Sequence, residues 1–241
     1  MKTQLNSILL KKNARVTGIL YLIIILSGLF SELVVRSKLI DWSDAQATAH
    51  NIADNTFLFR LGFVSDLIMV MSDVAVALLF YLLLKPVNKG LSLLAAFFRL
   101  AQATIIGLNL LNYFMPVLLL KNAIPNNFSS EQISSLSLLF LNAHSYGYLI
   151  SGVFFGISCI ILGYLIYKAA YFPKWLGGLV VAAGISYLID CLVNFLFPEC
   201  SADSEMLVMT VAVVSELSLC LYLLIKGVRM HSTKNDHPDI Q

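Results

Sequence analysis

The sequence predicts an all-α membrane protein, a six-transmembrane-helix bundle with two short outer helical elements, and three observations support this fold class. The 241-residue chain has a mean hydropathy of +0.82. Only 12% of its residues are charged and 59% are hydrophobic, whereas a soluble domain needs about 25% charged residues. The hydrophobic residues also fall in blocks long enough to cross a bilayer. This composition excludes a soluble enzyme, a nucleic-acid-binding domain and a disordered chain.

The apolar blocks are predicted to be helices because they lack the alternation of polar and apolar residues that barrel strands show. Each provides the roughly 20 residues that a spanning helix needs. The predicted spans are Val16–Val35, Phe57–Leu84, Leu91–Leu120, His144–Tyr167, Trp175–Phe197 and Met206–Val228. They form one domain, 16–230, between an N-terminal segment, 1–15, and a polar tail, 231–241.

Lysine and arginine are distributed unequally between the two sides of this bundle. Eleven lie in the N-terminal segment, the second and fourth connections and the C-terminal tail. The other side has four, which are Arg36, Lys38, Arg60 and Lys121. Because basic residues are retained on the cytoplasmic side, we expect a multi-pass protein of the cell membrane with both termini in the cytoplasm.

Two outer connections carry helix signals of their own. Residues Asp41–Asn55 form an alanine-rich run with capping residues at its start, which predicts a short surface helix. Ser129 followed by Gln132 fits a capping box, and Ile133–Asn142 is expected to continue into the fourth span.

Ionisable residues inside the spans cost roughly 2.5–3.5 kcal/mol each on insertion scales and need a partner, water or a purpose. Counted at 1.5 Å per residue, Asp73 and Arg99 fall at a similar height, roughly 12–17 Å from the cytoplasmic end. We therefore expect a buried ion pair between them. Such a pair could serve function, or it could only fix how the second and third spans dock.

A second set of polar residues lies near the outer side, and its four ionisable members, Asp66, His144, Asp190 and Glu216, come from four different spans. Asn109 and Tyr187 are further candidate members. Their similar depth predicts a polar cavity that opens outward. The alternative is that each acid pairs separately with a hydroxyl or an amide between neighbouring helices.

Motifs of known chemistry are missing from the sequence. It contains no nucleotide-binding loop, nucleophile elbow or zinc-protease motif. The four cysteines have no metal-binding or redox spacing and are expected to pack as small apolar residues. We therefore expect no metal site and no cofactor. The expected partners are the lipid bilayer and a small ion or small-molecule ligand, and no nucleic acid.

Short segments along nearly the whole chain carry a resemblance to a known family. They are Ala14–Leu22, Phe59–Gly62, Asp66 with Asp73, Lys85–Asn88, Phe98–Ala103 with Gly107 and Asn109, Phe154–Gly156, Gly163–Ile166, Gly184–Asp190, Ser215–Leu219 and Lys226–Val228. In this order they resemble the bacterial integral membrane proteins grouped as domain-of-unknown-function family 4386. The resemblance implies a compact membrane protein and brings no activity, substrate, cofactor or catalytic residue.

Three functions are compatible with these features. The first is a small ion- or proton-coupled transporter that uses the outward cavity, because carboxylates beside a buried arginine are the parts of a proton relay. The second is a non-catalytic sensor or accessory protein whose polar groups hold the bundle together. The third is an intramembrane lipid-modifying enzyme, which ranks lower because no nucleophile motif and no second intramembrane histidine occur.

Overall fold

The computed structural model describes residues 2–121 and 128–228, and within these ranges the regular structure is entirely helical. The predicted tail, 231–241, lies outside the described residues. The elements are α1 (Lys2–Leu29), a π-helix (Phe30–Arg36), α2 (Ser37–Leu39), α3 (Ala45–Asp54), α4 (Thr56–Leu84), α5 (Lys89–Leu120), α6 (Ser130–Lys168), α7 (Lys174–Leu196), a 3-10 turn (Pro198–Cys200) and α8 (Ser201–Ile225).

Six helical stretches within the described ranges are long and apolar enough to cross a membrane, which confirms the predicted fold class and a multi-pass membrane protein. They are Leu9–Leu39, Thr56–Leu84, Lys89–Leu120, Ser130–Lys168, Lys174–Leu196 and Ser204–Ile225. Their surfaces carry large apolar side chains such as Leu111 and Ile225, which are 68% and 67% exposed. This outward apolar surface suits contact with acyl chains.

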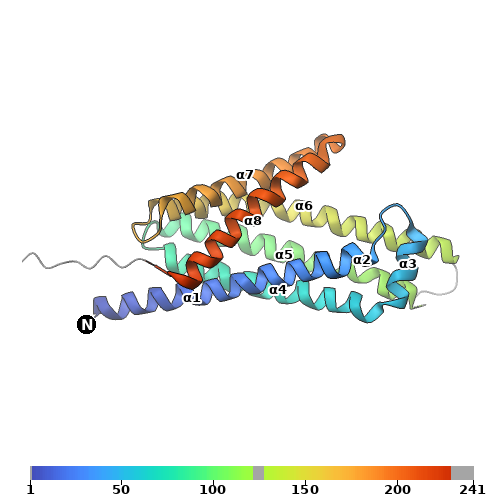
Figure 1. Cartoon of the computed structure of the whole chain (residues 1–241), viewed down its shortest axis with the longest axis horizontal. Helices are drawn as coiled ribbons and strands as arrows, with labels where there is room; N and C mark the ends of the chain where they lie inside the picture. The colour runs from blue at the N-terminus through green and yellow to red at the C-terminus, as the bar shows by residue number, and fades with distance from the viewer. Residues whose placement is uncertain (1, 122–127, 229–241) are drawn as a thin grey trace, which may run out of the picture.

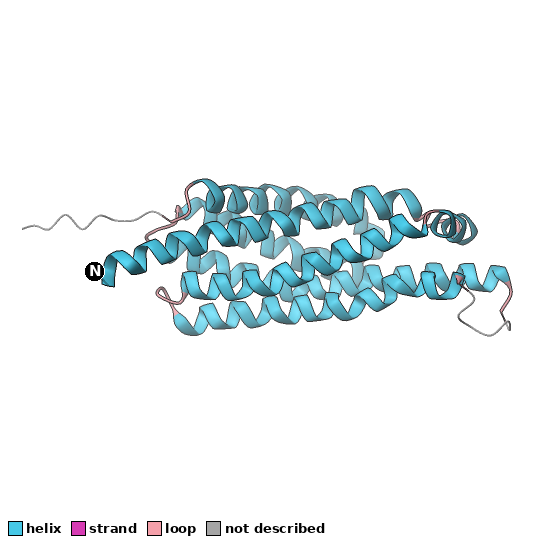
Figure 2. Ribbon diagram, turned by 90° about the horizontal axis from the view of Figure 1, so that it is seen from below, coloured by secondary structure: helices cyan, strands magenta, loops and turns pink. Residues whose placement is uncertain are grey.

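The six spans pack as a ring in chain order (Figures 1 and 2). Each spanning helix packs against the next, and α8 returns to pack against α1. The two described ends of the chain lie at one end of the bundle, which we call the terminal end, and α3 lies at the opposite end, the α3 end. The interior of the ring therefore receives side chains from all six spans.

The two outer helical elements begin at the caps that the sequence predicts. Asp44 accepts hydrogen bonds from the backbone N–H of Gln46 and of Ala47, each at 2.9 Å, and starts α3. Ser129 and Gln132 form a complete capping box at the start of α6. Helix α6 is 39 residues long because Ile133–Asn142 extends the fourth span without a break.

Helices α6 and α7 approach closely at two pairs of glycines. A Cβ atom built on Gly184 would lie 2.6 Å from the carbonyl oxygen of Gly156. One built on Gly177 would lie 2.6 Å from the carbonyl oxygen of Gly163. Because no side chain fits in either gap, the two backbones can touch, as in other membrane helix pairs with small residues at the interface.

The end of the first span differs from the prediction. Instead of ending at Val35, the helix passes through the π-helix and α2 to Leu39. Arg36 is consequently part of a spanning helix and is only 9% exposed, and Arg60 lies within α4. Neither arginine is fully exposed, whereas Lys38, next to the last residue of the first span, and Lys121 are the exposed basic residues among those counted on that side.

Candidate functional site

One side chain from each of the six spans contributes to a polar group in the interior of the ring, which we call the Arg99 group. Its members are Tyr21 (α1), Asp73 (α4), Arg99 (α5), Cys159 (α6), Tyr187 (α7) and Glu216 (α8). Electrostatic interactions connect all six. Because α8 packs against α1, Glu216 on α8 lies in the same interior as Tyr21 on α1.

The Arg99 group contains the ion pair expected between the second and third spans. Arg99 Nε donates to Asp73 Oδ1 at 2.8 Å, and Nη2 donates to the same oxygen. Both residues are 3% exposed or less. The rings of Tyr21, Phe80 and Phe155 surround the guanidinium, with centroids 5.3, 5.9 and 5.0 Å from its Cζ atom. An arginine suits this setting because its planar guanidinium also stacks on aromatic faces.

Glu216 is the second acid of the Arg99 group. Its Oε1 accepts a hydrogen bond from the Tyr187 hydroxyl at 2.8 Å, and the Tyr187 ring packs edge-on against Phe155 at 5.0 Å. Glu216 interacts electrostatically with Arg99 but forms no ion pair with it. The group thus holds two carboxyls and one guanidinium.

A second polar group lies nearer the α3 end, and we call it the Arg36 group. Its members are Ser31, Glu32, Arg36, Asp66, Tyr113, His144 and Tyr148. Arg36 Nη1 donates to Asp66 Oδ2 at 2.7 Å and to Ser31 Oγ at 2.9 Å, and Nε donates to Glu32 Oε2 at 2.7 Å.

The π-helix explains how Arg36 reaches these partners. In a π-helix, hydrogen bonds join residues five apart. Ser31 and Arg36 are therefore one turn apart on the same face of the π-helix, where both can turn toward α4. Asp66 is fully buried, so its charge depends on this contact.

Aromatic side chains enclose the other side of the Arg36 group. The rings of Tyr113 and Tyr148 lie 5.9 and 5.6 Å from the Arg36 Cζ atom, and the His144 ring lies 5.2 and 5.1 Å from those two rings. His144 Nδ1 is 3.1 Å from the carbonyl oxygen of Asn109, whose side-chain amide donates back to the His144 carbonyl at 2.7 Å.

The structure does not bring the four residues of the expected outward cavity together. Asp66 and His144 belong to the Arg36 group, and Glu216 belongs to the Arg99 group. Asp190 forms a third set, in which its Oδ1 accepts from Ser204 Oγ at 2.7 Å and from Asn194 Nδ2 at 3.1 Å. Among the described residues, no hydrogen bond or ion pair joins any two of Asp66, His144, Asp190 and Glu216.

The acids differ in the partners that they meet. Helices α7 and α8 are antiparallel neighbours, and Glu216 meets Tyr187, whereas Asp190, three residues beyond Tyr187, meets Ser204 near the start of α8. Ser204 lies twelve residues before Glu216, about 18 Å along the helix. Depth counted from the ends of the spans does not predict which neighbour a side chain meets. Arg36, the partner of Asp66, was assigned to a connection in the sequence prediction. The sequence offered one indication that Asp66 needs a basic partner: it is a second acid on the same helix as Asp73, two turns away, and Asp73 was already expected to pair with Arg99.

Each group contains three side chains of types that can bind metals, but these side chains are not gathered around one point. Within the described ranges, no set of three or more His, Cys, Asp or Glu side chains is placed to hold a metal ion.

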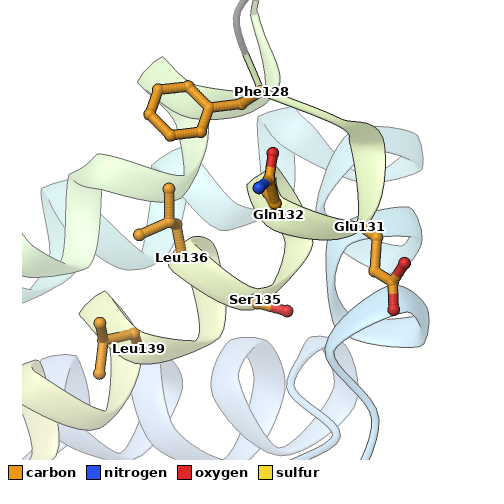
Figure 3. A pocket seen from close by; sticks show the side chains of 6 residues that line it. All are labelled: Phe128, Glu131, Gln132, Ser135, Leu136 and Leu139. Carbon is orange, nitrogen blue, oxygen red and sulfur yellow. The ribbon is translucent and has the colours of Figure 1, made fainter.

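An open hollow at the start of α6 is separate from both groups (Figure 3). It is lined by Phe128, Glu131, Gln132, Ser135, Leu136 and Leu139. These residues contribute no titratable pair or buried polar cluster.

Comparison with known proteins gives one family and one relative of interest. A family model described as "Domain of unknown function (DUF4386)" matches residues 16–227, a range that includes every member of the Arg36 and Arg99 groups. An uncharacterized protein of Archaeoglobus fulgidus is 35% identical over 128 residues, which cover 53% of this chain and 64% of that protein. The match thus spans less than two thirds of the archaeal protein. No solved structure matches the chain.

Proposed function

We propose that this chain, which belongs to the family described as domain of unknown function 4386, is a small proton- or ion-coupled transporter in which Glu216 is the proton-binding residue. One observation carries the proposal. Glu216, an acid that forms no ion pair with any residue of the ranges 2–121 and 128–228, lies in a polar group to which all six spans contribute.

The charges of the Arg99 group support proton binding. Arg99 and Asp73 neutralise each other in a buried pair. Glu216 adds a second carboxyl, so the group is neutral only when one carboxyl carries a proton. Its Oε1 accepts from Tyr187, Oε2 accepts no hydrogen bond within the described part of the chain, and the residue is partly exposed. Acids in this setting are typical of proton relays in membrane proteins.

The packing of α8 supports coupling between proton binding and movement. Helix α8 packs on α7 and α1 among the spans. An ionised Glu216 is attracted to Arg99 across the interior, whereas a protonated Glu216 keeps only its hydrogen bond with Tyr187. Proton binding therefore changes the force that draws α8 inward, which biases a conformational equilibrium.

We also propose that both termini are cytoplasmic. The support is the distribution of exposed basic residues. The terminal end carries Lys11, Lys12, Arg15, Lys85, Lys89, Lys168, Lys174 and Lys226, and the α3 end carries Lys38 and Lys121. This asymmetry is what the positive-inside rule selects.

Infrared difference spectroscopy tests the proton site directly. Purified protein in lipid should show a carboxyl C=O band that grows on acidification and is lost in Glu216→Gln. Asp190→Asn is the matched control, because Asp190 is another acid in a spanning helix but lies outside the Arg99 group. In proteoliposomes with an internal pH dye, Glu216→Gln should abolish proton uptake and Asp190→Asn should retain it.

The competing function, a sensor or accessory protein held together by its polar groups, makes a different forecast. Glu216→Gln would then change the stability of the bundle while both variants kept the same infrared carboxyl signal and the same proton uptake as the parent. That result would remove proton coupling from the Arg99 group.

A further inference from the structure

We propose that the protein binds the headgroup of an anionic phospholipid at the corner between α6 and α7. This α6–α7 corner consists of five exposed residues, which are Tyr164, Tyr167, Lys168, Lys174 and Trp175. The connection between the two helices lies at the terminal end of the bundle (Figure 1). Lipid binding at this corner is independent of proton binding at Glu216 and of the direction in which the chain crosses the membrane.

The terminal end carries positive charge that no acid offsets. Its described segments, 9–15, 85–91, 168–175 and 225–228, contain eight exposed lysines and arginines and neither aspartate nor glutamate. The α3 end differs, because Lys38 and Lys121 share it with exposed acids such as Asp44 and Glu131. The terminal end therefore attracts anionic headgroups in the leaflet that it contacts.

Two lysines of the α6–α7 corner are held beside tyrosine rings. Lys168 Nζ lies 5.7 Å from the ring centroid of Tyr164, and Lys174 Nζ lies 5.5 Å from that of Tyr167. The second contact joins α7 to α6 because the backbones touch there: a Cβ atom built on Gly177 would lie 2.6 Å from the backbone nitrogen of Tyr167. Tyr164 and Tyr167 are three residues apart and thus neighbours on the surface of α6. Both ammonium groups are therefore placed against the last turns of that helix.

The connection between the two lysines is anchored in the bundle. Ala169 and Phe172 are buried and belong to the hydrophobic core. The Tyr171 hydroxyl donates a hydrogen bond to the carbonyl oxygen of Leu83, at the end of α4, at 2.6 Å. Because the backbone around the lysines is already ordered, a ligand of the corner costs less conformational entropy to bind.

The depth of the corner favours a lipid phosphate as the ligand. The fourth span ends at Lys168 and the fifth begins at Lys174, so these ammonium groups belong to the boundary between hydrocarbon and headgroups. Exposed tyrosine and tryptophan side chains are typical of that boundary. Ammonium groups form charge-assisted hydrogen bonds with phosphate oxygens, and a tyrosine hydroxyl can donate another. A net negative headgroup is preferred to a zwitterionic one because it brings no second cation to the lysines.

Tryptophan fluorescence measures lipid binding at this corner. The chain has two tryptophans, so Trp42→Phe leaves Trp175 as the only reporter. The full-length variant is reconstituted in phosphatidylcholine with increasing amounts of phosphatidylglycerol that has brominated acyl chains, which quench the fluorescence. Brominated phosphatidylcholine is the reference, and the two quenching curves give a relative binding constant. Trp175→Phe, which leaves Trp42 beside α3, is the control reporter for the opposite end.

Phosphatidylglycerol should bind about fivefold more tightly than phosphatidylcholine at Trp175, from the attraction of lysines to anionic lipid, and Trp42 should report no preference. Replacing Lys168 and Lys174 together by glutamine should abolish the preference, and replacing both by arginine should retain it. The matched control is Lys12→Gln with Arg15→Gln, which removes the same charge from the terminal end on α1. That variant should keep the preference.

The proposal is overturned if Trp175 reports no preference, or if the preference survives in the glutamine variant of the corner. It is overturned as well if the α1 variant loses the preference equally, since the charge of the whole terminal end would then act without a local site. Inorganic phosphate is added at constant ionic strength as a last arm. If it removes the preference, the corner binds a soluble anion instead of a lipid.

Discussion

Asp66 and Asp73 lie two turns apart on one face of α4, and each holds a different buried arginine. Asp66 accepts from Arg36 at 2.7 Å, and Asp73 accepts from Arg99 at 2.8 Å. The two arginines come from the helices on either side of α4 in the ring, α1 with its π-helical extension and α5. Helix α4 is therefore joined to both neighbours by charges that would be costly to leave unpaired.

Asp73→Asn should destabilise the protein by about 3–5 kcal/mol, because Arg99 would keep its charge in the interior without a partner. Unfolding in mixed micelles measures the free energy. The double variant Asp73→Asn with Arg99→Gln should recover part of the loss. Asp54→Asn, at an acid on α3 whose side chain is 61% exposed, serves as the control. Equal stability of Asp73→Asn and this control would contradict the importance of the pair.

Gly177→Ala should destabilise the contact between α6 and α7 by about 1–3 kcal/mol, the usual cost of overpacking. The new Cβ atom would meet the backbone of Gly163 and of Tyr167. Gly178→Ala is an adjacent control, since nothing lies within 4 Å of its added Cβ atom. Thermal unfolding should show a lower midpoint for the first variant only. A tolerated Gly177→Ala would mean that the helices can separate without loss.

Cys200 should react with a membrane-impermeant maleimide added to intact cells. Of the four cysteines, which are all free, Cys200 is exposed and the other three are buried. Labelling should disappear in Cys200→Ser. Adding Lys89→Cys to that variant should restore it only after the cells are permeabilised, because Lys89 is exposed at the terminal end. Labelling of Lys89→Cys on intact cells would reverse the proposed orientation.

Reporter fusions provide a second measurement of the same topology. A fusion after Asn88 should report the cytoplasm, and one after Asn127, which lies outside the described residues, should report the external side. Two reporters on the same side would contradict six spans.

Asp41 should give the connection before α3 a pH-dependent stability. Its Oδ1 accepts from the Ser43 hydroxyl at 2.7 Å and from the Ser43 backbone N–H at 3.0 Å, and these bonds lower the pKa of Asp41 below its ordinary value of 3.8. A lowered pKa means that the stabilisation is complete above 3.8 and is lost as the pH falls through the folded-state pKa. Ser43→Ala should raise the pKa of Asp41 toward 3.8 in an NMR titration, and Ser37→Ala, whose hydroxyl bonds Leu33, should not.

Local signals in the sequence predicted the spans and the outer helices. Hydrophobic length sets where a helix crosses a bilayer, and Asp44 and Ser129 cap the helices that follow them because the capping bonds join residues two or three apart. The ion pair of Asp73 with Arg99 could be expected because the two helices are consecutive and their depths match.

Contacts that depend on the rotation of a helix could not be predicted in the same way. The π-helix changes the register at the end of the first span, and no residue in Phe30–Arg36 signals it, so Arg36 was assigned to a connection. The depth of Glu216 and Asp190 could be counted from the ends of their spans, but depth alone does not say which neighbour each side chain meets. Glu216 meets Tyr187 and Asp190 meets Ser204, so they belong to two distinct polar sets.

The order of the ring also determines when its closing contact forms during synthesis. Each span from α4 to α7 emerges directly after a neighbour that it packs against, whereas α8 must also find α1, which was made five spans earlier. Helix α8 packs closely on α1 at Gly18, where an added Cβ atom would lie 2.9 Å from the backbone nitrogen of Leu224. A nascent chain without α8 has Arg99 paired but lacks Glu216, so any proton chemistry at that residue is withheld until insertion into the membrane has finished.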